Sequence, residues 1–209
     1  MSDSEPRLVP EAEGAGTKRA EYTDRLVSLQ TVWWKRVLPV QAPFRYNVRR
    51  LPLGRTLDIG CGLGRILKQI DGNGVGIDHN PDFVEYCRRA GLVAYTTEEF
   101  DSAPEAVEGS FDSLILAHVV EHLDPAVTDS ILEKYLPFVR PGGYAHFMTP
   151  QELGYRSDPT HITYVDSDGL RALAERHGLT VVKSYSFPFP RAAGRAFKYN
   201  KFNVLTRKA

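Results

Sequence analysis

Three glycines at alternate positions, Gly60, Gly62 and Gly64, follow directly on the apolar segment 55–59. Glycine has no Cβ, so this spacing predicts a tight strand-to-helix turn whose backbone a ligand can approach closely. Asp78 ends the next apolar segment, eighteen positions after Gly60. An acidic residue there is placed to accept hydrogen bonds from the hydroxyl groups of a ribose. The glycine turn and Asp78 together predict a nucleoside-binding α/β sheet.

Apolar and amphipathic segments alternate along the rest of the chain. We expect strands at 55–59, 75–77, 92–96, 111–117, 144–148, 179–187 and 202–206. We expect helices at 64–70, 81–90, 98–107, 124–139 and 166–177, a turn at 141–143 and a loop at 149–165. This alternation predicts a doubly wound, mostly parallel sheet with helices on both faces and right-handed crossovers.

The composition divides the chain into three parts. Residues 1–20 are rich in Ser, Glu, Pro, Gly and Ala, which predicts a disordered tail. Residues 21–52 hold two helical patterns, 21–37 and 43–51, which predict a helical extension over a sheet edge or over the mouth of the active site. Residues 53–209 then form the ligand-binding domain. The aromatic residues of the extension fit either a lid or plain packing: Tyr22, Trp33, Trp34, Phe44 and Tyr46.

Four motifs of the ligand-binding domain occur in a recognisable order and spacing. Asp58 stands two residues before a Gly-x-Gly-x-Gly pattern, and Arg65 occupies the position where a dinucleotide-binding turn needs its third glycine. The other motifs are 74–78, 111–123 and 136–143. Together they resemble the class I S-adenosylmethionine-dependent methyltransferases over roughly residues 55–185. The resemblance implies a Rossmann-like sheet of seven strands in the order 3-2-1-4-5-7-6, with strand 7 antiparallel.

The resemblance also implies a cofactor, S-adenosylmethionine, which leaves as S-adenosylhomocysteine. Because ligands of open α/β sheets bind at the carboxyl ends of the strands, the glycine turn is expected to meet the methionine part and Asp78 the ribose. His79 and either Glu99 or Phe100 are expected beside the adenine. The full expected cofactor set is Asp58, Gly60, Cys61, Gly62, Gly64, Asp78, His79, Glu99, Phe100, Ala117 and His118.

A metal site is an alternative that the sequence leaves open. His118, Glu121 and His122 have the H-x-x-E-H spacing of one class of zinc peptidases, but here the motif follows a buried strand. Some methyltransferases of small RNA 3′ ends and of ubiquinone biosynthesis carry Glu-x-x-Glu-His at this place and hold a divalent ion with it. This chain has His118 instead of the first Glu, with His161 as a fourth ligand. We expect no metal: His118 would line the cofactor pocket, while Glu121 and His122 hold the local turn.

The segment 149–161 is the expected substrate loop, because it leaves the carboxyl end of a strand and is long and polar. His161 is the candidate general base, since imidazole titrates near neutral pH and methyl transfer to a hydroxyl benefits from removal of a proton. Asp158 is the candidate residue to orient it, and His118 is a third catalytic candidate. A purely structural hydrogen bond would explain His161 equally well.

The composition favours a small-molecule enzyme. Lys and Arg number 26, as do Asp and Glu, so the formal charge of zero does not favour nucleic acid. Two cysteines and the lack of a long apolar run predict a cytoplasmic protein with no membrane partner. We expect methyl transfer to an oxygen or nitrogen of a small molecule. The alternatives are a divalent-metal-dependent RNA 2′-O-methyltransferase and a non-catalytic S-adenosylmethionine-binding module. No motif specifies the acceptor or the oligomeric state.

Overall fold

The computed structural model describes residues 42–209. The predicted tail, the predicted helix at 21–37 and its aromatic residues therefore lie outside the described residues. The second predicted helix of the extension is α3 (Ala42–Arg49). Within residues 42–209, no helix combines the length and the apolar character needed to cross a bilayer.

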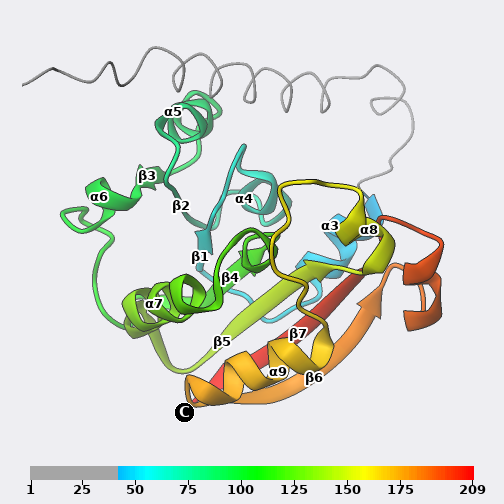
Figure 1. The fold of residues 1–209 in the computed structure, drawn as a ribbon. Helices are drawn as coiled ribbons and strands as arrows, with labels where there is room; N and C mark the ends of the chain where they lie inside the picture. Colours follow the sequence, from blue (N-terminus) through cyan, green and yellow to red (C-terminus); the bar gives the residue numbers. More distant parts are fainter. Residues whose placement is uncertain (1–41) are drawn as a thin grey trace, which may run out of the picture. The chain divides into compact units, whose positions relative to one another are not determined.

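A seven-stranded sheet forms the centre of the described domain (Figure 1). Its strands are β1 (Thr56–Ile59), β2 (Gly74–Asp78), β3 (Ala94–Thr96), β4 (Phe111–Ala117), β5 (Val139–Pro150), β6 (Leu179–Phe187) and β7 (Lys201–Lys208). They lie in the order β3-β2-β1-β4-β5-β7-β6, and β7 pairs antiparallel with both β5 and β6. The predicted strand order and the antiparallel strand 7 are confirmed.

Helices cover both faces of this sheet, as predicted. The α-helices after β1 are α4 (Arg65–Gln69), α5 (Pro81–Arg89), α6 (Thr97–Phe100), α7 (Pro125–Tyr135), α8 (Glu152–Arg156) and α9 (Ser167–Arg176). Short 3-10 helices are η1 (Val120–His122), η2 (Leu136–Phe138) and η3 (Arg191–Arg195). Side chains of α6, α7 and α9 join one core cluster, whereas α3 and α4 join a second and α5 a third.

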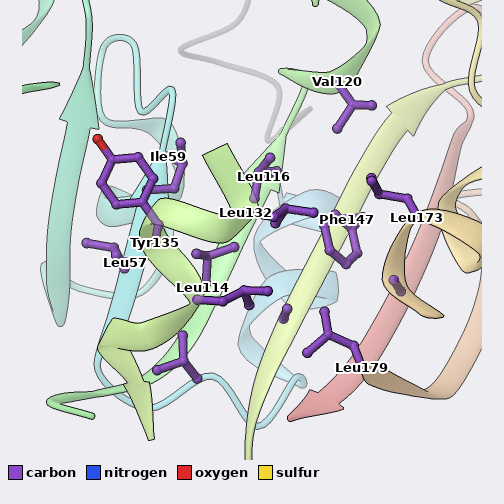
Figure 2. Close-up of a cluster of buried hydrophobic side chains, with 14 of the residues drawn as sticks. Leu57, Ile59, Leu114, Leu116, Val120, Leu132, Tyr135, Phe147, Leu173 and Leu179 are labelled. Carbon is purple, nitrogen blue, oxygen red and sulfur yellow. The ribbon is translucent and has the colours of Figure 1, made fainter. Parts of the chain in front are cut away.

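The two larger clusters meet opposite faces of β4. Successive side chains of a strand point to opposite faces, so Leu114 and Leu116 enter the first cluster while Ile115 enters the second. In the first cluster, shown in Figure 2, Leu132 of α7 and Phe147 of β5 lie around the same part of the sheet. Burial of β4 on both faces explains its nearly continuous apolar sequence.

The prediction of a separate turn at 141–143 is wrong, because β5 begins at Val139 and runs through it. The ladder between β4 and β5 passes from Phe111 opposite Val139 to Ser113 opposite Tyr144, so the extra residues of β5 form an irregularity within the strand. Gly143 is required there, since a Cβ would lie 2.7 Å from the carbonyl oxygen of Asp112.

Two helices are shorter than predicted and one was missed. The helix expected at 98–107 ends at Phe100, because Pro104 would clash with the carbonyl four residues earlier. The helix expected at 124–139 ends at Tyr135, and Pro137 lies in η2. The predicted loop at 149–165 contains α8, a helix of five residues that is too short to show a helical period.

His146 makes the stability of the fold depend on pH. The side chain is fully buried in β5, and burial lowers its pKa to about 4. The unfolded chain therefore takes up a proton near pH 6.5 while the folded chain does not, so stability is lost as the pH falls below about 6.5. We expect His146 to contribute about 2 kcal/mol of this loss between pH 7 and pH 5. Urea unfolding of the wild type and His146→Leu at both pH values measures it, and an equal loss in both proteins would contradict this role.

Candidate active site

The glycine turn between β1 and α4 leaves an open space on one side. All three glycines have positive φ angles, +68° at Gly60, +52° at Gly62 and +68° at Gly64. A Cβ at Gly60 or Gly64 would lie 2.5 Å from a neighbouring side chain, whereas a Cβ at Gly62 would meet nothing within 4 Å. Gly60 and Gly64 are thus required by packing inside the protein. Gly62 instead faces unfilled space, which is the arrangement expected of a cofactor cradle.

Asp78 lies at the end of β2 and holds the turn in place. Its two carboxylate oxygens accept the backbone N–H groups of Gly62, at 2.8 Å, and Asn80, at 2.9 Å. Only 5% of the residue is exposed. Each carboxylate oxygen can accept more than one hydrogen bond, so both retain capacity for a ligand hydroxyl. The structure thus shows a direct hydrogen bond between Asp78 and Gly62, which the spacing of the two residues in the sequence could not establish.

Asp58 and Cys61 lie beneath the same turn. Asp58 is buried at the end of β1, and burial, with the charges of Cys87 and Asp78 adding to it, raises the pKa of its carboxyl group well above the usual value. Its Oδ2 has no hydrogen-bond partner among the described residues. A buried carboxyl oxygen without a partner is a candidate to accept a hydrogen bond from a bound ligand. The side chain of Cys61 packs inward, so only its backbone can face the cradle.

The residues predicted beside the adenine occupy different environments. His79 follows Asp78 and its side chain is 86% exposed. Phe100 is fully buried against the rings of Tyr135 and Phe138, so its ring belongs to the core. Glu99 is the third residue of α6, where its carboxylate accepts the backbone N–H of Thr96 in a capping box. Their contact with an adenine stays a prediction.

The capping role of Glu99 has a measurable consequence. Its hydrogen bond from Thr96 and its ion pair with Arg88, at 2.6 Å, lower the pKa of its carboxyl group. Loss of a helix cap costs about 1 kcal/mol. We expect Glu99→Ala to lower the free energy of unfolding by this amount without changing affinity for the cofactor. A fivefold or larger loss of affinity in calorimetry would instead favour the adenine contact.

His118 follows β4 in a left-handed conformation, with φ +63°. Its backbone N–H donates to the carbonyl of Met148, and its Nδ1 lies 2.8 Å from Oε1 of Glu121. Burial and the charge of Lys201 lower the pKa of His118 to about 4, so the ring is neutral at pH 7. Burial alone would raise the pKa of Glu121, but the hydrogen bond with His118 lowers it. A neutral imidazole therefore faces an ionised carboxylate at this position. Ala117, the residue before His118, is half-buried and packs against the second core cluster.

The structure brings together three of the four alternative metal ligands. Glu121, His122 and His161 each offer a ligand atom, and these atoms all lie within 4.8 Å of one another. Glu121 Oε2 has no hydrogen-bond partner among the described residues. His118 is the fourth residue of the alternative set and touches the group through Glu121. A carboxylate and imidazole nitrogens form a donor set that suits zinc and neighbouring transition metals.

The predicted substrate loop places His161 against Tyr155. The two rings stack at 5.4 Å, and Nδ1 of His161 lies 2.7 Å from the backbone carbonyl of Tyr155. Since a carbonyl only accepts, Nδ1 carries the proton, which leaves Nε2 of a neutral ring with its lone pair. Asp158 has a different partner, because its carboxylate accepts the N–H and hydroxyl of Thr160. The Tyr155 carbonyl, in place of Asp158, orients His161.

Lys201 is a residue near the site that the sequence did not indicate. Lys201 is the first residue of β7 and lies opposite Pro150, the last residue of β5. Its Nζ is 4.8 Å from the ring centroid of Phe44 in α3. The signal that could have indicated Lys201 is the antiparallel pairing of β7 with β5. In such a pair, the first residue of one strand lies beside the last residue of the other. Phe44 was considered only as one of five aromatic residues of the extension.

Comparisons with known proteins agree with this geometry. A family model described as a methyltransferase domain matches residues 36–184. Comparison with curated proteins gave no match.

The first of three similar solved structures is a SAM dependent methyltransferase from Archaeoglobus fulgidus, with a TM-score of 0.62 and 21% identity over 79% of this chain and 93% of that chain. The second is the N-methyltransferase NodS from Bradyrhizobium japonicum WM9 in complex with S-adenosylhomocysteine, with a TM-score of 0.66 and 17% identity over 91% and 98%. The third is the Burkholderia thailandensis 1,6-didemethyltoxoflavin-N1-methyltransferase, with a TM-score of 0.60 and 18% identity over 99% and 93%. At these identities the likeness shows the fold.

Proposed function

The chain belongs to the class I S-adenosylmethionine-dependent methyltransferases, and from this premise we propose that it methylates an oxygen or nitrogen of a small-molecule acceptor. The observation that carries the proposal is the link between Gly62 and Asp78 at the carboxyl end of the sheet. We assign His118 and His161 to the acceptor side, since His118 is hydrogen-bonded to Glu121 and Glu121 lies in one group with His161. Two of the similar structures are named as N-methyltransferases, one of them for 1,6-didemethyltoxoflavin, which supports a small acceptor.

S-adenosylmethionine is the cofactor of this family, and when bound it supplies a methyl group made electrophilic by its sulfonium. The residues of this chain fit it: the cradle at Gly62 is open, and Asp58 Oδ2 is buried without a partner among the described residues. Asp78 would hold the ribose hydroxyls through the free capacity of its carboxylate. The backbone of the glycine turn would lie along the methionine part.

In this proposal, His118 and His161 hold the acceptor at the acceptor side of the site, and His161 deprotonates it. His161 is the base, because the Tyr155 carbonyl fixes its tautomer and leaves Nε2 free to take a proton from the acceptor. His118 stays neutral and lines the pocket between the cofactor and Glu121. The main contribution of such a site is to align the acceptor with the methyl group and to exclude water.

Calorimetry tests the proposal. We expect the full-length protein to bind S-adenosylmethionine and S-adenosylhomocysteine, and an acceptor screen to release S-adenosylhomocysteine, which then inhibits turnover. No binding of either compound by the wild type would overturn the proposal. Binding without turnover across the screen would favour a non-catalytic S-adenosylmethionine-binding module.

A second candidate, methyl transfer that depends on a divalent metal, is favoured by the cluster of Glu121, His122 and His161. The unpartnered Oε2 of Glu121 and the imidazole nitrogens would hold the ion. A bound ion would lower the pKa of an acceptor hydroxyl, such as an RNA 2′-hydroxyl, which is the chemistry of the RNA alternative.

Elemental analysis separates the two candidates. A metal-dependent enzyme would contain about one equivalent of zinc, manganese or iron, lose activity in EDTA, and lose the ion in Glu121→Gln. Thr160→Ala is the matched control, since it removes a partner of His122 and no ligand. A metal-free protein whose activity survives EDTA would contradict the metal candidate and leave the first proposal intact.

A further inference from the structure

Two cations at the carboxyl end of the sheet lack a counter-ion. Among residues 42–209, neither Arg65 nor Lys201 forms an ion pair, whereas Lys134, Arg140 and Arg191 each do. Arg65 is the first residue of α4 and directly follows the glycine turn. Lys201 starts β7. The two therefore come from elements that are far apart in the sequence and begin at the same edge of the sheet.

The surroundings of Lys201 place it at the acceptor side of the site. It lies opposite Pro150, two residues after Met148, whose carbonyl binds the backbone of His118. The ring of Phe44 lies against its ammonium group, with Nζ 4.8 Å from the ring centroid. Phe44 in turn packs edge-on against Phe187 of β6, at 5.7 Å. Lys201 is thus a half-buried cation held between a strand end and an aromatic ring.

The charges in this region do not balance. Arg65 and Lys201 repel each other, and burial with the charge of Arg65 lowers the pKa of Lys201 to about 7. Glu121 is the acidic group that acts on Lys201, but its Oε1 is bound to His118. Two cations therefore act near one carboxylate, and that carboxylate already has a hydrogen-bond partner. Lys201 is half-buried and Arg65 is exposed. An anion that binds to both would reduce the excess positive charge and form charge-assisted hydrogen bonds.

We propose that Arg65 and Lys201 form a subsite for an anionic group of the methyl acceptor, a carboxylate or a phosphate, with Phe44 flanking the carbon atoms next to that group. The inference rests on the proposed function, because it assigns one part of the acceptor that the methyltransferase would use. The two cations bind and position the acceptor through its anionic end. They leave proton removal to His161.

Calorimetry on full-length protein saturated with S-adenosylhomocysteine tests the subsite with two isosteric probes, benzoate and benzamide. We expect the wild type to bind benzoate at least tenfold more tightly than benzamide, and phenyl phosphate at least as tightly as benzoate. Lys201→Met should remove the preference for benzoate, and Arg65→Met should reduce it. Lys201→Arg, which keeps the charge, should retain it. Lys198→Met is the matched control, because Lys198 is exposed in the connection just before β7 and lies over Tyr199.

The outcomes separate this inference from the proposed function. If the wild type binds no S-adenosylhomocysteine, the proposed function fails before the probes are added. If it binds S-adenosylhomocysteine but shows no binding of benzoate, or equal binding of benzoate and benzamide, the subsite is overturned. It is also overturned if Lys198→Met loses as much benzoate affinity as Lys201→Met. An equal loss of S-adenosylhomocysteine affinity in Lys201→Met would assign the cations to the cofactor's own carboxylate instead.

Discussion

Replacing Asp78 with alanine is expected to weaken binding of S-adenosylmethionine by about 100-fold, or about 2.7 kcal/mol. The substitution removes the carboxylate that would accept the ribose hydroxyls, and hydrogen bonds to a charged group contribute about 1.5–3 kcal/mol each. It also leaves the N–H groups of Gly62 and Asn80 without their partner, so the turn that forms the cradle loses its anchor. Isothermal titration calorimetry measures the change.

Two further variants give this experiment its controls. Asp78→Asn keeps one oxygen acceptor and is expected to lose less affinity than Asp78→Ala. Asp82→Ala removes an exposed acid four residues later and is expected to bind like the wild type. Binding by Asp78→Ala within threefold of the wild type would contradict the assignment of Asp78 to the ribose.

Replacing Gly62 with asparagine is expected to remove measurable cofactor binding while the protein stays folded. Asparagine tolerates a positive φ better than most residues, so the backbone cost is about 1 kcal/mol. A Cβ at Gly62 meets nothing within 4 Å, and the new side chain would project into the space that we assign to the cofactor. Calorimetry with S-adenosylhomocysteine and urea unfolding together separate the effect on binding from the effect on stability.

Gly178 supplies the matched control for this variant. It has φ +69°, its Cβ would also meet nothing within 4 Å, and it lies between α9 and β6. Gly178→Asn should therefore cost the same stability and leave cofactor binding unchanged. Equal cofactor affinity in Gly62→Asn and Gly178→Asn would show that the open side of the glycine turn is not the cradle.

The sequence predicted the fold well, because the features that specify it are local. The apolar segment 111–117 and the segment 179–187 have the bounds of β4 and β6, and proline at the first helical turn marked α5 and α7. The strand order came from the resemblance. The irregularity in β5 was not predictable, since Pro141, Gly142 and Gly143 form a turn in most contexts. Here they lie within the strand because β4 pairs with Val139 before them and with Tyr144 after them.

The site residues that could be predicted from the sequence are those that belong to a motif of fixed spacing. Asp78 and Gly62 are of this kind, and the structure adds the hydrogen bond between them. The grouping of Glu121 and His122 with His161 was considered in the sequence only by analogy, because 39 positions separate His122 from His161. Lys201 was missed because a cation before a strand is usually solvated, and only the pairing with β5 brings it to the site.

The place of β7 in the sheet sets the order in which the protein can assemble during synthesis. β6 leaves the ribosome before β7, yet β7 lies between β5 and β6, so β6 has no neighbouring strand until β7 has been made. The five strands β1 to β5 can pair earlier. The glycine turn and Asp78 lie at the ends of β1 and β2, so the proposed cofactor site can form on a nascent chain. The proposed anion subsite is completed only afterwards, because Lys201 is the first residue of β7.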